Sequence, residues 1–152
     1  MIGTAHHYGV TVSDMDEVLP FYRDTLGLEL LSEGHVEEGS EDSEKFENFV
    51  GVDGAVDVEV AFLDAGGCQV ELLQYNSPEG GDAHGASNND AGASHFCLEV
   101  DDIDTLYEEL TDDGIEFIHE PITLSKGVRV AYMYDPENNI VELSDRSRMD
   151  ED

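Results

Sequence analysis

The sequence predicts an α+β fold made of two βαβββ modules. In each half of the chain, a stretch of helical periodicity is flanked by short segments in which apolar and polar residues alternate, the pattern of strands with one buried face. Four polar residues also stand at matching places in the two halves, His7 and His95 in the first strand of each module, Glu71 and Glu142 in the last. Such a repeat indicates a shared architecture.

The first module is expected over residues 1–75. Its opening strand is predicted at about 5–12. Ser13 or Asp14 can cap the helix that follows, and the apolar residues of this helix repeat at helical spacing until Gly27 ends it. Three further strands are expected near 28–31, 57–63 and 68–75.

The second module is expected over residues 93–146 and repeats this order. A strand at 94–100 is followed by a helix that Asp101 or Asp102 can cap and that Gly114 stops. Three further strands are expected near 115–119, 128–134 and 139–144.

Three segments fall outside this pattern. Residues 32–56 are acidic and Gly-rich, and we interpret them as an insertion or loop with one short helical turn. Residues 76–92 have the composition of a linker loop. The acidic tail, residues 147–152, is expected to fray.

The chain is strongly acidic: 37 Asp and Glu residues against 6 Lys and Arg give a net charge of −31, spread over its 152 residues. A hydrophobic fraction of 39% argues against disorder. Repulsion between so many like charges opposes compaction. In molar salt the Debye length falls to about 3 Å, and this repulsion is largely screened. We therefore expect a cytoplasmic protein of a salt-accumulating halophile, with neither nucleic acid nor an anionic membrane as partner.

Other sequence features agree with this expectation. No apolar run approaches the length of a membrane span, and the first residues lack the pattern of a secretory signal. Cys68 and Cys97 alone form no disulfide framework and indicate a reducing interior.

The alternation places the four matching residues on one side of the predicted strands. Tyr8, Val10 and Val12 pack toward the helix, so His7 points away from it, and His95, Glu71 and Glu142 follow the same rule. This is the concave side of a curved sheet, where a pocket is expected. Two imidazoles and two carboxylates suit one divalent metal held between the halves. His6, one residue away, is expected to face the helix layer and receives no ligand role.

Several stretches of the chain resemble the vicinal oxygen chelate superfamily, which includes glyoxalase, methylmalonyl-CoA epimerase, extradiol dioxygenases and bleomycin-resistance proteins. The resemblance covers essentially the whole chain and is fairly specific where FYRDTLGL and DPENNIVEL occur together. It implies two modules forming a cup-shaped mixed sheet with helices outside, one divalent metal per chain (zinc, nickel, cobalt or manganese) on the four residues named above, and a homodimer.

The resemblance implies a glyoxalase-type lyase or isomerase, similar to lactoylglutathione lyase. Such a metal keeps one or two positions open for a small-molecule substrate with adjacent oxygens, and it stabilises an enediolate-like intermediate as Lewis acid. A metal-ligand carboxylate moves the proton. We expect Glu142 to be this base, with Glu71 as the alternative. If the substrate is a thiol adduct, the sequence does not identify the thiol.

Three alternatives remain. A methylmalonyl-CoA epimerase-like enzyme fits the same ligand set, although this chain has GASHF and YDPENN where those epimerases carry a GHH-type doublet and an HP-K-rich ending. An extradiol-type dioxygenase would use two His and one Glu with iron or manganese. A non-enzymatic protein that sequesters a small molecule such as a drug would bind its ligand without turnover.

Further residues are candidates for the pocket. Arg129 is expected on the pocket side, where it would hold an anionic part of the substrate. Tyr75 and Cys97 are expected to line the same pocket. His84 and His119, the other histidines that a dioxygenase might use, are interpreted as solvated or structural.

The charge generates a prediction about salt. Because the carboxylates repel one another more weakly in concentrated salt, the protein should melt at a higher temperature in 2 M than in 0.1 M KCl and should lose structure in low salt. Circular dichroism melts at the two concentrations measure this effect. An unchanged melting temperature would contradict the halophilic interpretation.

Overall fold

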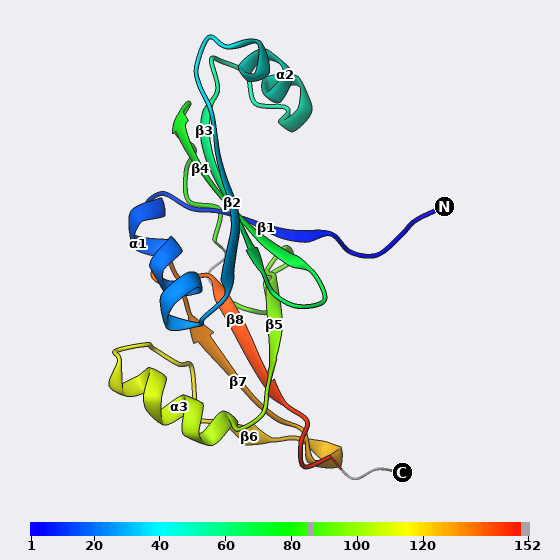
Figure 1. Cartoon of the computed structure of the whole chain (residues 1–152). Helices are drawn as coiled ribbons and strands as arrows, with labels where there is room; N and C mark the ends of the chain where they lie inside the picture. Colours follow the sequence, from blue (N-terminus) through cyan, green and yellow to red (C-terminus); the bar gives the residue numbers. More distant parts are fainter. Residues whose placement is uncertain (85–86, 150–152) are drawn as a thin grey trace. The chain divides into compact units, whose positions relative to one another are not determined.

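The computed structural model describes residues 1–84 and 87–149 and divides the chain into two compact units, Met1–Ala83 and His84–Asp152 (Figure 1). Residues 85–86 of the expected linker loop and 150–152 of the expected tail lie outside the described residues. Each unit contains one four-stranded mixed sheet built on a βαβββ order, with a second helix added between β2 and β3 of the first unit, which confirms the predicted α+β class. Among the described residues, no helix is long and apolar enough to cross a membrane.

The first unit forms a sheet in the order β1-β4-β3-β2. Strands β1 and β4 pair in parallel. The β2–β3 and β3–β4 pairs are antiparallel. The elements are β1 (His7–Thr11), α1 (Met15–Pro20), the π-helical turn η1 (Phe21–Thr25), β2 (Glu29–Val36), α2 (Glu41–Val50), β3 (Asp57–Asp64) and β4 (Gln69–Ser77).

The first helix begins and ends close to the residues that the sequence indicated. The Asp14 side chain caps α1 by accepting the backbone N–H of Asp16 at 3.1 Å. After Pro20 the helix continues as η1, and Leu26 N donates to the Phe21 carbonyl at 2.9 Å. Gly27 follows with a φ of 76°, in the left-handed region that glycine adopts easily.

Residues 32–56, expected as an insertion or loop with one short helical turn, contain more regular structure than predicted. Strand β2 continues to Val36, and a ten-residue helix, α2, lies at the far end of the β2–β3 hairpin (Figure 1). Ser40 caps α2 by accepting Ser43 N–H at 3.1 Å. Acidic residues in the first turn interact favourably with the positive end of the helix dipole. The buried hydroxyl of Ser43 donates to the Val56 carbonyl and anchors the helix.

The second unit repeats the sheet in the order β5-β8-β7-β6, again with a parallel pair, β5 and β8, and antiparallel neighbours. Asp102 caps its helix by accepting Thr105 N–H at 3.2 Å. The elements are β5 (His95–Val100), α3 (Ile103–Asp112), β6 (Ile122–Thr123), the 3₁₀ turn η2 (Ser125–Gly127), β7 (Arg129–Tyr134) and β8 (Ile140–Asp145).

The strand predicted at 115–119 is not formed as a strand. Only Phe117 makes a bridge, to Met133 of β7, and the chain bends at residues 118–120 before β6 begins. Pro121, which lacks an N–H, precedes the two paired residues of β6 and cannot donate to a sheet ladder. The edge strand β6 is therefore shorter than the predicted strand at 115–119 and begins further along the chain.

The turn between β7 and β8 is held by Asp135, a carboxylate that is 3% exposed. This carboxylate accepts the backbone N–H groups of Glu137 at 2.8 Å and Asn139 at 2.9 Å, and the side-chain amide of Asn139 at 2.7 Å. Asn138 adopts a φ of 66°, which asparagine tolerates better than most residues. The DPENN sequence therefore has a structural role, because it fixes where β8 begins opposite β7.

The apolar cores confirm the predicted alternation. In each unit the alternate residues of the strands that face the helix are buried, with α1 packed against β4 and α3 against β8. The buried apolar residues on these faces are Val10, Ala61, Leu63, Val70 and Leu72 in the first unit and Ala131, Met133, Val141 and Leu143 in the second.

An ion pair in the β2–β3 hairpin makes stability depend on pH. His35 Nε2 lies 2.7 Å from Asp57 Oδ1, and this contact raises the pKa of His35 above its usual 6.5. Hydrogen bonds from Asn76, His35 and the Glu38 backbone lower the pKa of Asp57 to about 2. Stabilisation from the raised His35 pKa is lost as pH rises through that pKa, and stabilisation from the lowered Asp57 pKa is lost as pH falls from 3.8 toward 2.

We therefore predict that His35→Gln lowers the melting temperature most between about pH 4 and 6.5 and least at alkaline pH. Melts of both proteins in molar KCl across this range measure the difference, and Asp57→Asn in each background isolates the pair. A stability difference that grows from pH 6 to pH 9 would contradict this assignment.

Candidate functional site

The first unit places His7 and Glu71 together on the sheet face opposite its helix. Val70 and Leu72 on either side of Glu71 are fully buried, so the alternation of β4 turns Glu71 to the other face. His7 Nε2 of the adjacent β1 lies 3.6 Å from Glu71 Oε1. The side chains are 39% and 18% exposed, which leaves the imidazole accessible and the carboxylate partly enclosed.

Two neighbours of Glu71 shape this pair. Gly9 is its partner on β1, and a Cβ at Gly9 would stand only 3.3 Å from Glu71 Oε1, so the absence of a side chain leaves the carboxylate its place. Phe62 is its partner on β3, and the Phe62 ring stands nearly perpendicular to the His7 ring with centroids 5.6 Å apart. The pair therefore has a small residue on one side and an apolar ring on the other.

His6 also belongs to this group, contrary to the expectation that it faces the helix layer. Its side chain is exposed, and its Nδ1 lies 2.8 Å from His7 Nδ1. Strand β1 begins only at His7, so strict strand alternation does not extend to His6. The sequence signal that was available is the doublet of adjacent histidines at the start of a strand.

The second unit places His95 and Glu142 together in the same way. Glu142 lies between the buried Val141 and Leu143 of β8, and the separation between His95 Nε2 and Glu142 Oε2 is 3.0 Å. The side chains are 38% and 21% exposed, close to the values in the first unit. Each unit therefore brings one histidine and one glutamate together.

Tyr132 is a site residue that the sequence reasoning missed. It lies directly across from Glu142 on β7, and its hydroxyl is 3.2 Å from His95 Nε2 and 3.4 Å from Nδ1. Burial raises the pKa of Tyr132, and the charge of Glu142 raises it further. The alternation of β7, in which Ala131 and Met133 are buried, was the signal that places Tyr132 on the opposite face.

The neighbours of the two glutamates differ between the units. Gly9 and Phe62 flank Glu71, whereas Cys97 and Tyr132 occupy the corresponding positions beside Glu142. The strand partners of Glu71 therefore carry no polar side-chain group, whereas those of Glu142 carry a thiol and a phenol. The repeat conserves the backbone arrangement while the two pairs have different chemical surroundings.

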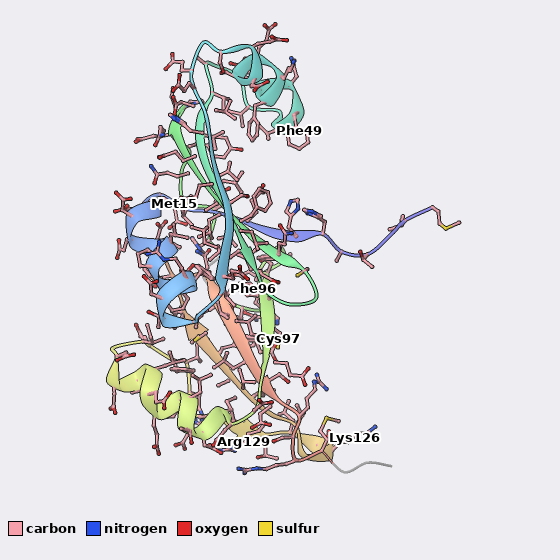
Figure 2. All side chains as sticks on the ribbon, in the orientation of Figure 1. Met15, Phe49, Phe96, Cys97, Lys126 and Arg129 are labelled. Carbon is pink, nitrogen blue, oxygen red and sulfur yellow. The ribbon has the colours of Figure 1, made fainter. Side chains whose placement is uncertain are left out.

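Two of the expected pocket residues lie on the same faces as these pairs. Cys97, labelled on β5 in Figure 2, is the strand partner of Glu142; burial raises the pKa of its thiol and Glu142 raises it further. Tyr75 lies four residues after Glu71 on β4, and burial followed by the charge of Glu71 raises its pKa. The Tyr75 ring also contacts Phe46 of α2, with centroids 6.4 Å apart.

Arg129 lies elsewhere, at the start of β7 near α3 (Figure 2). It shares the phase of the buried Ala131 and Met133, which face the helix, and its guanidinium binds the Asp104 carboxylate through Nε at 3.0 Å and Nη2 at 2.7 Å. Arg129 thus points to the helix side, away from the face of Glu142. We leave it out of the proposed site for this reason.

The two other histidines have structural contacts. His84 Nε2 lies 2.8 Å from Asn139 Oδ1 in the β7–β8 turn. His119 Nδ1 lies at the same distance from the Glu120 carbonyl oxygen.

Each pair supplies a neutral nitrogen donor and an anionic oxygen donor, the donor types that borderline divalent metals accept. Within residues 1–84 and 87–149, no three His, Cys, Asp or Glu side chains are grouped closely enough to hold a metal ion. The described geometry therefore gives one two-donor pair in each unit.

Comparisons with known proteins concern the chain as a whole. The sequence model of the Glyoxalase/Bleomycin resistance protein/Dioxygenase superfamily matches residues 4–143. The chain is 26% identical over 139 residues to a probable lactoylglutathione lyase of Synechocystis sp., covering 90% of this chain and 91% of the relative. It is 27% identical over 123 residues to the mitochondrial methylmalonyl-CoA epimerase of Bos taurus, covering 78% of this chain but only 59% of the relative.

Among solved structures, a glyoxalase family protein from Bacillus cereus superposes with a TM-score of 0.82. The match covers 95% of both chains at 24% identity, a level at which it shows the fold alone.

The surroundings of Cys97 generate a prediction that requires no metal. Because thiolate is the reactive form, the raised pKa of Cys97 slows its alkylation, and Glu142→Gln should accelerate it by removing a nearby negative charge. We expect about a two- to fivefold increase in rate at pH 8 with a chelator present, since each pKa unit changes the thiolate fraction up to tenfold. Mass spectrometry follows Cys97 and Cys68 separately.

Glu109→Gln is the matched control, because Glu109 is an exposed carboxylate on α3 and is not among the charges that act on Cys97. An unchanged or slower rate in Glu142→Gln would show that Glu142 does not act on the thiol.

Proposed function

Because the chain belongs to the Glyoxalase/Bleomycin resistance protein/Dioxygenase superfamily, we propose that it is a metal-dependent lyase or isomerase of the glyoxalase type. The observation that carries this proposal is the repeated pair: His7 with Glu71 and His95 with Glu142 occupy equivalent strands and meet at 3.6 Å and 3.0 Å. Their repetition at equivalent positions of the two sheets supports a shared role better than an accidental one.

The donor set fits one divalent ion. Two imidazoles contribute no charge and two carboxylates balance the ion, and such a set suits zinc, nickel, cobalt or manganese. The space that Gly9 leaves beside Glu71 and the partial exposure of all four side chains keep the donors available. We propose that these four residues hold one ion per chain.

When bound, such an ion acts as a Lewis acid for negative charge that develops on adjacent oxygens of a small-molecule substrate. The chain itself supplies the proton transfer. Glu142 is the proposed base, and Glu71, which is enclosed to a similar degree (18% against 21% exposed), is the alternative. Tyr75 and Cys97, on the faces of the two pairs, are proposed to contact the substrate.

Lyase and epimerase activities both transfer a proton next to a carbonyl group. The relative from Synechocystis sp. favours the first, because the match covers nearly the full length of both chains. The bovine epimerase makes acyl-CoA epimerisation the second candidate. We further propose that the protein acts in the cytoplasm as a homodimer, which sedimentation in molar KCl would test.

The first experiment measures metal content in protein purified without a His-tag in molar KCl. We expect about one divalent ion per chain in the parent protein, and reduced metal content or affinity in each of His7→Ala, Glu71→Gln, His95→Ala and Glu142→Gln. Glu109→Gln, which removes an exposed carboxylate from α3, should bind like the parent. Absence of metal after incubation with nickel, zinc, cobalt and manganese would refute the site.

Activity then separates the candidates. Isomerisation of hemithioacetals prepared from several thiols tests the lyase, and epimerisation of acyl-CoA substrates tests the second candidate. With saturating metal, loss of the proposed base should lower kcat about 10²- to 10⁴-fold, so comparison of Glu142→Gln with Glu71→Gln identifies it. Stoichiometric ligand binding without turnover would instead indicate a sequestering protein.

A further inference from the structure

The two site histidines differ in what contacts their rings. The His95 ring is approached by the Tyr132 hydroxyl, whereas the His7 ring is approached by a second imidazole, that of His6. The His6 and His7 rings are nearly perpendicular with centroids 5.1 Å apart, and their Nδ1 atoms are separated by 2.8 Å, a hydrogen-bond distance.

The position of His6 is supported from two sides. Its backbone carbonyl accepts the N–H of Gln69 at 2.9 Å, at the point where β4 begins. Its ring also lies against Phe62, with centroids 6.5 Å apart and an interplanar angle of 77°. Phe62 therefore contacts both histidine rings, and His6 is held at the edge of the sheet although its side chain is exposed.

The contact between the two Nδ1 atoms restricts the tautomers. In a hydrogen bond between neutral imidazoles, one Nδ1 carries the proton and the other accepts it. His7 Nε2 faces Glu71 Oε1 and is the nitrogen available to a metal, so this nitrogen must be unprotonated when it acts as a ligand. The proton of His7 then resides on Nδ1 and is donated to His6 Nδ1.

We infer that His6 is a positioning residue that holds His7 in the Nδ1–H tautomer with Nε2 directed toward Glu71, and that it thereby tightens divalent-metal binding. Metal-binding histidines commonly donate their second N–H to a partner, and loss of such a partner costs about 10- to 100-fold in affinity. This inference rests on the proposed metal function, but its tautomer component can be measured without metal.

The test compares His6→Leu, which removes the acceptor, with His6→Asn, whose side-chain oxygen can accept from His7 Nδ1. His119→Ala is the control, since His119 contacts only the neighbouring Glu120 carbonyl among the hydrogen bonds described. Long-range ¹H–¹⁵N spectra of metal-free protein at pH 8 report the tautomer of His7. Titration with Co²⁺, followed by its visible absorption, reports affinity and the number of ligands.

In metal-free protein the Glu71 carboxylate, 3.6 Å from His7 Nε2, favours the other tautomer, so we expect a larger Nδ1–H fraction in the parent and in His6→Asn than in His6→Leu. The Co²⁺ affinity of His6→Leu should fall about tenfold with the visible spectrum unchanged, while His6→Asn and His119→Ala should bind as the parent does. Parental affinity and tautomer in His6→Leu would overturn the inference. A His6→Leu spectrum typical of a lost ligand would overturn it too, because His6 would then bind the metal itself.

Failure of the proposed function gives a different result. If the parent binds no Co²⁺, the metal site is refuted, and the metal component of the inference is refuted with it. The NMR comparison would still show whether His6 sets the tautomer of His7.

Discussion

The site depends on one constraint, the burial of a single face of each sheet. Val70 and Leu72 in β4, and Val141 and Leu143 in β8, are all buried against a helix-bearing layer, and the residue between each two must face the other way. Both glutamates occupy that position. The parallel strand beside each glutamate, β1 or β5, then brings a histidine alongside. The apolar pattern therefore selects the face on which the polar chemistry occurs.

The same constraint explains what could be predicted from the sequence. The opening strands, the capped helices and the phases of the four site residues all follow from local alternation and capping. Helix α2 did not, because its acidic residues resemble a loop in composition, and its stability comes from Ser40 at its N-terminus and the buried Ser43 contact. Arg129 was assigned to the wrong side because Ala131 and Met133 are core residues, a fact that burial reveals and spacing does not.

Contacts between residues distant in sequence were the hardest to foresee. Tyr132 approaches His95 only because the β7–β8 pairing sets Tyr132 opposite Glu142. His6 precedes the first paired residue, so no periodicity describes its side chain. In both cases the surroundings of a histidine, and not the histidine itself, distinguish one half of the repeat from the other. Duplication accounts for the shared backbone, and these surroundings are where the two halves differ chemically.

The Asp135 turn sets a limit on how the chain can change in length. Because its carboxylate binds both Glu137 and Asn139, the number of residues between β7 and β8 is specified by hydrogen bonds. If one residue were inserted or deleted there and the register of β8 slipped by one, the two faces of β8 would be exchanged, bringing Glu142 into the core and Leu143 to the surface. Length variation among descendants of this sequence should therefore be tolerated around α2, where no site strand changes phase, and be selected against in this turn.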